Sequence, residues 1–534
     1  MNEHYQLSGT GFGDKDSEIL PKMDRPDVYR INAFRVLQVP VTASAREVSA
    51  QLRKLDLMEK LGDAGETVRG IMPFVPPPDS HARREAAQRL NDPELRLIDE
   101  LFWFWPLSPS LSEDMDEALA AIERNDFSEA VSIWQRHETE GSEANVSMHN
   151  LAIMYHALAL DLEHLEARQP LSKEQIQQKR DYWAQSFARW QILLDHDGFW
   201  HRLAERVRIL DDPRITIHTV RGIQAGLPLA LLSINATLAV QAAQQDNHGN
   251  VRYHISLMRE SGFDKAMVDA AMRRAVAPIR DRVKIICTNA ASETDKVPEH
   301  TAQVTHNVID QTSRLLSTLD MLLPAGHPTL EAAHDEVALL ILKSQIALGN
   351  KTRDWDTPLG LLEQALQIAC SASTRQHIED NIRIFRDNLL YVTCWFCGQH
   401  TPDHQSTSEV KMYANVTRSG GYVYFHKITV GVPRCTRCKS SHARRRISAI
   451  WGVVSGAVLG SLATYGIGVV AYPDSGGVSL IAIPVGILAG YLIGCAIGQL
   501  PSGVKPESSK KKFPRVKTMQ SEGWMLGEKP PEVG

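Results

Sequence analysis

Cys394-Trp395-Phe396-Cys397 and Cys435-Thr436-Arg437-Cys438 are two Cys-x-x-Cys pairs, and a glycine-rich apolar stretch begins soon afterwards at Ile447. Two residues between cysteines allow one tight turn to aim both thiolates at a single tetrahedral ion. The sequence therefore predicts one metal site with the ligands Cys394, Cys397, Cys435 and Cys438, and structural Zn²⁺ is the ion we expect there.

The chain between the two pairs has the composition of a β-hairpin. Val410–Val416 and Tyr422–Val432 contain β-prone residues, and Ser419-Gly420-Gly421 would form the turn between them. Residues 391–443 are therefore predicted to be a small β zinc ribbon. A single iron ion and a pair of redox dithiols are the alternatives for the cysteines. We expect His400, His404 and His442 to be solvated loop residues, not ligands.

The apolar stretch predicts a two-helix transmembrane hairpin over residues 447–500. There is no charged residue from Ile447 to Tyr472 or from Gly477 to Leu500, and Pro473-Asp474-Ser475-Gly476 makes a turn between these runs. Each run exceeds the ~20 residues that cross a bilayer core as a helix.

Glycines recur at every fourth position of both runs, which places them on one face of each helix. Such faces let helix backbones approach closely within a membrane. Packing within the hairpin is the favoured interpretation, and homo-oligomerisation through a second glycine face is the alternative. The glycines concerned are Gly452, Gly456, Gly460, Gly486, Gly490, Gly494 and Gly498.

Basic residues bracket the hairpin. Arg444, Arg445 and Arg446 precede it, Lys510, Lys511 and Lys512 follow it, and the intervening turn has no Lys or Arg. The positive-inside rule then predicts that both termini are cytoplasmic. The arginines are expected to meet anionic lipid head groups, and nucleic acid is not favoured as a partner.

Length and composition allow three or four domains of ordinary size in the 534 residues. A net charge of −5 excludes a globally basic nucleic-acid binder, and seven cysteines are too few for a disulfide scaffold. Cys287, Cys370 and Cys495 lie in apolar contexts and are expected to be packing thiols. Residues 1–27 are polar and acidic and predict a disordered leader, while residues 501–534 would be a cytoplasmic tail.

A helical module is predicted over residues 28–106. A short helix would carry Phe34 and Leu37, and Ser44 with Glu47 forms a capping box for a second helix ending near Leu61. A third helix is expected from Ser80 to Phe102. The aromatic run Phe102-Trp103-Phe104-Trp105 should pack against the chain that follows it.

This order resembles the J-domain of co-chaperones. The stretches Asn32-Ala-Phe-Arg-Val-Leu37 and Asp92-Pro93-Glu-Leu-Arg96 to Trp105 are similar to those of bacterial J-domain-like proteins. The resemblance implies a chaperone link. However, a J-domain triggers its heat-shock ATPase partner with His-Pro-Asp, and this chain has Pro76-Pro77-Pro78-Asp79 there. We therefore expect no ATPase stimulation.

Residues 110–390 predict an α-helical, tetratricopeptide-like body. Helix pairs are expected over 115–137 and 356–388, and a long helix over 145–165, with alanines where helices would cross. His149, His156 and His164 are interpreted as core or surface residues. No metalloprotease, phosphate-binding or dinucleotide-binding motif is present.

The fold class predicted is therefore mainly α, with one small β ribbon. The expected function is a non-enzymatic, membrane-anchored scaffold in the bacterial inner membrane that binds partner proteins. A metal- or redox-responsive sensor and a glycine-zipper oligomer that acts on the membrane are the alternatives.

Overall fold

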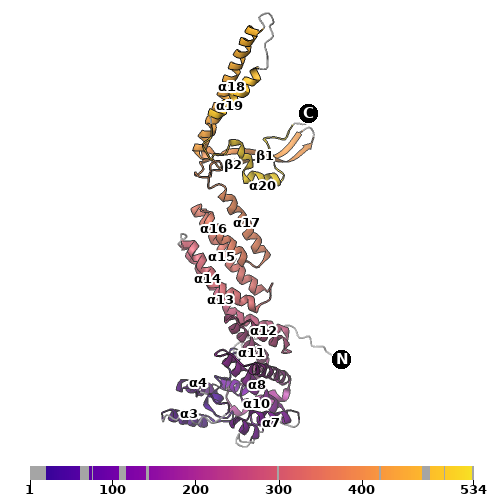
Figure 1. Cartoon of the computed structure of the whole chain (residues 1–534). Coiled ribbons are helices and arrows are strands. Elements are labelled where there is room, and N and C mark those ends of the chain that lie inside the picture. Colours follow the sequence, from indigo (N-terminus) through magenta and orange to yellow (C-terminus); the bar gives the residue numbers. More distant parts are fainter. Residues whose placement is uncertain are drawn as a thin grey trace. The chain divides into compact units, whose positions relative to one another are not determined.

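The structure is a computed structural model. It describes residues 20–60, 71–74, 76–107, 116–139, 144–296, 300–419, 422–471, 482–497 and 499–531. The chain is mainly helical with one small antiparallel sheet, as the sequence predicts (Figure 1). The helices and strands are η1 (Leu20–Lys22), α2 (Ala33–Leu37), α3 (Ala45–Lys60), α4 (Ser80–Asn91), α5 (Pro93–Leu101), α6 (Glu117–Glu123), α7 (Phe127–Thr139), α8 (Ala144–Glu166), α9 (Lys173–Leu194), α10 (Asp197–Leu210), α11 (Ile217–Gln244), α12 (His248–Glu260), α13 (Lys265–Lys296), α14 (Thr301–Leu322), α15 (Pro328–Thr352), α16 (Asp356–Ile368), α17 (Ala372–Leu389), η4 (His404–Ser406), β1 (Ser408–Ser419), β2 (Tyr422–Val432), α18 (Thr436–Ala471), α19 (Ala482–Ile497), η5 (Glu507–Lys512), α20 (Pro514–Ser521) and β3 (Met525–Leu526).

The chain divides into two compact units. One comprises residues 1–286 and 310–333, and the other comprises residues 287–309 and 334–534. The long helices α13, α14 and α15 contribute residues to both units.

The first unit contains a continuous hydrophobic core formed by residues between Met23 and Leu238. The aromatic run is buried within it: Phe104 stacks on Trp134 at 5.5 Å between ring centroids, and Trp105 stacks on Phe199 at 5.4 Å. The prediction that these rings pack against the following chain is confirmed. Because residues from Met23 to Leu238 share this core, the segment predicted to be a J-like module and the helices that follow it are packed as one structure.

Local capping explains where the first helices begin and end. Glu47 accepts a 2.6 Å hydrogen bond from the Ser44 backbone N–H, and the Glu47 N–H donates to the Ser44 hydroxyl at 3.4 Å, so both hydrogen bonds of the expected capping box are present. The single helix predicted from Ser80 to Phe102 is wrong, because it is broken into α4 and α5. Pro93 has no N–H to continue α4, and the Asp92 side chain caps α5 instead.

The predicted disordered leader is corrected at its end. Met23 is fully buried in the core, and Asp24 pairs with Arg274 at 2.9 Å. Residues 20–27 are therefore folded, and residues 1–19 lie outside the described residues.

Several helices that follow one another in the chain pack in pairs. Such pairs include α6 with α7, α8 with α9 and α16 with α17. Asn125 has φ of +60° in the turn between α6 and α7, a conformation that Asn tolerates better than most residues.

The second unit carries the sheet, whose strand order is β2-β1-β3. β1 and β2 are the two strands predicted between the cysteine pairs, and their pairing runs from Ser408 opposite Val432 to Ser419 opposite Tyr422. Gly420 and Gly421 of the predicted turn lie outside the described residues. β3 belongs to the C-terminal segment, and Leu526 pairs with Met412.

The helices α18 and α19 lie side by side and antiparallel, where the hairpin was predicted (Figure 1). Gly490 of α19 sits directly on the α18 backbone, because a Cβ at this position would overlap the carbonyl oxygen of Gly452 and lie 2.8 Å from Cα of Gly456. The favoured interpretation of these glycines, packing within the hairpin, matches this contact. Residues 472–481, which include the predicted turn, are outside the described residues.

Among the described residues, α11 is the helix whose length and apolar composition would suffice to cross a membrane. Its most apolar window is 67% buried inside the protein, as in the central helix of a folded core. α19 has 16 residues, fewer than the ~20 that span a bilayer core.

Candidate metal centre

The first cysteine pair lies on a tight turn before β1 in the chain. The backbone N–H of Gly398 donates a 2.7 Å hydrogen bond to the carbonyl oxygen of Cys394. Gly398 has φ of +67°, which glycine adopts without strain. The turn therefore brings Cys394 and Cys397 to the same side of the loop.

The second cysteine pair lies at the junction of β2 and α18. Cys435 directly precedes α18, and Cys438 lies in its first turn. The backbone N–H of Cys438 points at the Cys435 sulfur at 3.4 Å. The first turn of α18 therefore brings Cys435 and Cys438 together, as the tight turn at Gly398 does for Cys394 and Cys397.

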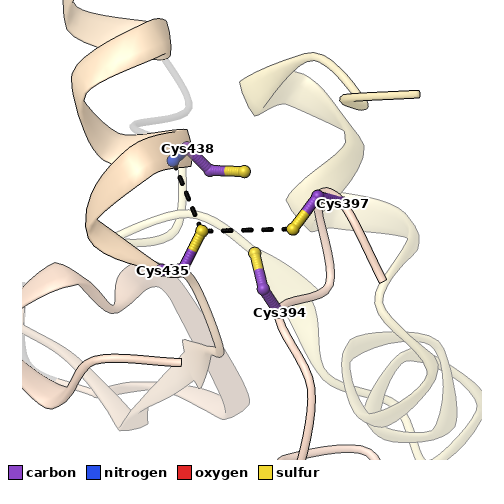
Figure 2. Close-up of side chains that lie close together, drawn as sticks. All are labelled: Cys394, Cys397, Cys435 and Cys438. Atoms are coloured by element: carbon purple, nitrogen blue, oxygen red, sulfur yellow. Dashed lines mark hydrogen bonds between the residues drawn. The ribbon is translucent and has the colours of Figure 1, made fainter. Parts of the chain in front are cut away.

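The four sulfur atoms converge on one point (Figure 2). All lie within 4.8 Å of one another, and Cys397 Sγ is 4.0 Å from Cys435 Sγ. A tetrahedral site with metal–sulfur bonds of about 2.3 Å has sulfur–sulfur edges of about 3.8 Å. The donor set and its spacing therefore fit a metal ion held by four thiolates.

The environment of the four thiols is uneven. Cys394, Cys435 and Cys438 are buried, whereas Cys397 is partly exposed. Burial raises the pKa of Cys435 and of Cys438. Burial also acts on Cys397, but hydrogen bonds from the backbone of Gln399 and His400 outweigh it and lower its pKa to about 6. A bound cation would hold all four groups as thiolates.

The C-terminal segment encloses the cysteines, which the sequence did not reveal. Phe513, Val516 and Met519 are buried in the same core as Cys394, Cys435 and Cys438. The segment expected to be a tail from residue 501 is thus packed against the metal site and adds β3 to its sheet. The spacing of three residues between Phe513, Val516 and Met519, which covers α20 and the residue before it, was the available sign of an amphipathic helix.

Polar contacts fix the same segment to both cysteine pairs. The ammonium group of Lys505 lies 3.7 Å from the centre of the Trp395 ring. Glu507 pairs with Arg434 at 3.2 Å and with Arg446 at 2.8 Å. The segment before α18 and the segment after α19 therefore contact each other where the helix pair begins and ends.

Two expectations about single residues are corrected. His442 is not a solvated loop residue: it is buried on α18, and its Nε2 lies 3.0 Å from the carbonyl oxygen of Lys505. Cys370 is exposed, so it is not a packing thiol, whereas Cys287 is buried as predicted. The surroundings of Cys495 lie outside the described residues.

The remaining predicted residues lie on α18, α19 and η5 or outside the described residues. Arg444, Arg445 and Arg446 lie on α18 between Cys438 and the apolar stretch, and Lys510, Lys511 and Lys512 end η5. Gly460 is buried on α18. Gly486 and Gly494 belong to α19, though their surroundings are outside the described residues, as is Gly498 itself.

The first unit also contains a buried polar network that the sequence does not predict. Lys179 pairs with Glu163 at 3.0 Å, and the Trp183 indole N–H donates to the same carboxylate at 3.1 Å. Burial tends to raise the Glu163 pKa, but hydrogen bonding to His254 and the nearby charges lower it to about 2. Lys179, Glu163 and Trp183 each have a polar partner in the core, which is typical of structural networks.

The histidines expected to be core or surface residues are largely core. His149 and His156 are fully buried. Burial lowers the pKa of His149 to about 4 and that of His156 to about 3, so both are neutral at pH 7. His156 Nδ1 lies 3.0 Å from the Tyr29 hydroxyl, which places it in a hydrogen bond and away from any metal.

No protein-family model, curated protein or solved structure matches this chain. The four-cysteine centre and the exposed helix pair are therefore interpreted from their own chemistry.

Proposed function

We propose that this protein is a membrane-anchored scaffold in which a structural Zn²⁺ centre joins a helical body to a membrane-inserted helix pair. The observation that carries the proposal is the exposed apolar surface of α18 and α19. Trp451 is 66% exposed, Leu488 is 61% exposed and Ile497 is 75% exposed. A contiguous apolar surface of this kind marks contact with lipid or with another protein.

The position of the basic residues favours lipid as that contact. Arg444–Arg446 and Lys510–Lys512 lie at the base of the helix pair, on the side of the metal centre. Cationic side chains at this level are attracted to the anionic head groups of the cytoplasmic leaflet. Both helix ends then lie in the cytoplasm, as the positive-inside rule expects for a bacterial inner-membrane protein.

Zn²⁺ is the ion that best suits the centre. Four thiolates in a closed tetrahedral set leave no open coordination position, which is the arrangement of structural zinc sites. The centre would stabilise the junction between body and anchor and perform no reaction. Metal analysis of the purified full-length protein distinguishes the ions: one zinc per chain supports the proposal, and one iron contradicts it.

The helical body would supply the surface for partner proteins. Its paired helices are the arrangement by which helical repeats present extended binding faces. The J-like residues are proposed to dock proteins without stimulating a heat-shock ATPase. Pro78-Asp79 matches only the last two residues of the His-Pro-Asp motif. The Asp79 carboxylate accepts a 2.8 Å hydrogen bond from the Ala82 N–H and so caps α4.

Membrane fractionation followed by crosslinking tests the two halves of this proposal separately. Resistance of the full chain to alkaline carbonate extraction is expected, and complete extraction would contradict membrane insertion. Crosslinking mass spectrometry in native membranes should then give reproducible partner peptides attached to residues of the body. Crosslinks confined to copies of this chain would contradict the scaffold.

A redox-responsive centre is the second candidate. Its support is the partial exposure of Cys397, whose sulfur lies 3.4 Å from His400 Nδ1 while the other three cysteines are buried. Exposure of one ligand gives an oxidant access to the site. Release of the metal by micromolar peroxide, reversed by thiol, would favour the sensor over the purely structural centre.

A further inference from the structure

A cavity of about 520 Å³ lies at the base of α18 and α19. Its polar end is formed by His442, Arg445, Arg446 and Glu507, and its apolar end by residues such as Val454 of α18 and Tyr491 of α19. The cavity therefore combines charged and apolar walls at the point where the helix pair leaves the metal-binding domain.

The charged end has an excess of positive charge. Glu507 is the acidic residue of the lining, and it is shared between Arg446 and Arg434, at 2.8 and 3.2 Å. Among the described residues, Arg445 forms no ion pair or hydrogen bond. Its guanidinium group is therefore available for an anion, and arginine presents the forked donors that suit phosphate oxygens.

His442 adds a second, independent sign of a missing ligand. Only 5% of this residue is exposed, and its Nε2 is occupied by the carbonyl oxygen of Lys505. The other ring nitrogen, Nδ1, is buried without a hydrogen-bond partner in the described part of the chain. Because Nε2 carries the hydrogen, Nδ1 is an acceptor that lacks a donor, and a buried polar atom of this kind is costly unless it is paired.

We propose that this cavity binds a glycerophospholipid whose headgroup carries a hydrogen-bond donor. Arg445 contacts the lipid phosphate, a headgroup hydroxyl or ammonium donates to His442 Nδ1, and an acyl chain lies along Val454 and Tyr491. This inference rests on the proposed membrane insertion. It predicts that phosphatidylglycerol and phosphatidylethanolamine bind in preference to phosphatidylcholine, whose headgroup has no donor.

Native mass spectrometry of the zinc-loaded, full-length protein with single added lipids tests the proposal. Arg445→Gln should weaken phosphatidylglycerol binding at least tenfold. Arg444→Gln is the matched control, because Arg444 is exposed on the same helix and does not line the cavity. Equal weakening by both variants would show a general surface-charge effect and overturn the site. Retained zinc in each variant confirms that the domain has folded.

Two further arms identify the ligand. Diacylglycerol, which lacks the phosphate, should bind at least tenfold more weakly than phosphatidylglycerol, and equal binding would overturn the role of Arg445. Inorganic phosphate should not compete at millimolar concentration, since competition would indicate a free-anion site and not a lipid site. Carbonate extraction of Arg445→Gln should be unchanged, so failure of this lipid site is distinguishable from failure of membrane insertion.

Discussion

Lys505 donates its backbone N–H to the carbonyl oxygen of Phe396 at 2.8 Å, across more than a hundred residues of chain. Phe396 lies between the first two cysteines, whereas Lys505 follows the helix pair. The α18–α19 pair is therefore an insertion within the domain that carries the four cysteines, not an extension after it. Under the proposed membrane insertion, a helix pair that starts and ends at one small domain enters and leaves the membrane on the same side.

The C-terminal segment should be required for a stable metal centre. Phe513 is fully buried and meets the rings of Trp395 and Tyr391 edge-on, each with centroids 5.5 Å away. We expect Phe513→Ala to destabilise the domain by about 3–5 kcal/mol because it leaves a cavity. Zinc transfer to a chelator should become much faster, as followed with a colorimetric indicator.

Lys512→Ala is the matched control for this change, since Lys512 is the preceding residue and is exposed. It should leave zinc transfer unchanged. Equal rates for Phe513→Ala and the wild-type protein would mean that the C-terminal segment does not support the metal site.

Removal of one thiol should empty the metal centre. Cys397→Ser replaces a ligand by a hydroxyl that binds zinc weakly, so the metal content should fall from one per chain to near zero. Loss of the ion should also expose the ribbon to limited proteolysis, because structural zinc contributes directly to folding. Cys370→Ser removes an exposed thiol remote in sequence from the pairs and should change neither measurement.

The sequence predicted the parts of the second unit whose constraints are local. The spacing within each cysteine pair and the turn glycine Gly398 act over a few residues, and so does the alternation of β-prone residues in β1 and β2. The docking of residues 501–531 depends instead on contacts such as Leu526 with Met412 and Glu507 with Arg434. No local pattern specifies such long-range partners. The four cysteines are therefore predictable from the sequence, but their enclosure by the C-terminal segment and the cavity beside them are not.

The same distinction explains the first unit. Caps such as Ser44 with Glu47 are read from adjacent residues, whereas the burial of Met23 and the ion pair of Asp24 with Arg274 require the folded core. The break between α4 and α5 at Pro93, in contrast, is a local feature, and the prediction of one helix across it is wrong. Proline at the first position of a new helix looks like an interruption of one long helix when the sequence alone is considered.

Contact between the two helices should depend on a single small residue. Gly490→Leu places a side chain where the backbones of Gly452 and Gly456 now lie, so α19 must move away from α18. We expect a loss of about 1–3 kcal/mol or more in detergent, measured by thermal unfolding. Cysteine crosslinking between the two helices should also decline.

Ala496→Leu is the comparison, because Ala496 is an exposed residue of α19 that does not line the cavity between the two helices, whereas Gly490 does. It adds a side chain of similar size without meeting α18, and should leave both measurements near the wild-type values. A loss confined to particle size, with the helix crosslinks intact, would assign Gly490 to an interface between copies of the chain.

Acid should destabilise the first unit through its buried histidines. His149 and His156 have pKa values of about 4 and about 3 in the folded protein, against 6.5 when unperturbed. Below pH 6.5 the unfolded chain therefore binds protons that the folded chain does not, and stability falls as the pH falls toward these folded values. By pH 4.5 each histidine should have cost about 2–3 kcal/mol of unfolding free energy, since one pKa unit corresponds to about 1.4 kcal/mol.

Urea unfolding followed by tryptophan fluorescence measures this dependence, because Trp183 and Trp190 lie beside these histidines. His156→Leu should lower stability at pH 7, since the Tyr29 hydroxyl loses its partner. It should also make the unfolding free energy fall less steeply between pH 6.5 and 4.5, because unfolding of the variant takes up as much as one proton fewer. A variant whose stability declines as steeply as that of the wild-type protein would show that His156 is already charged in the folded core.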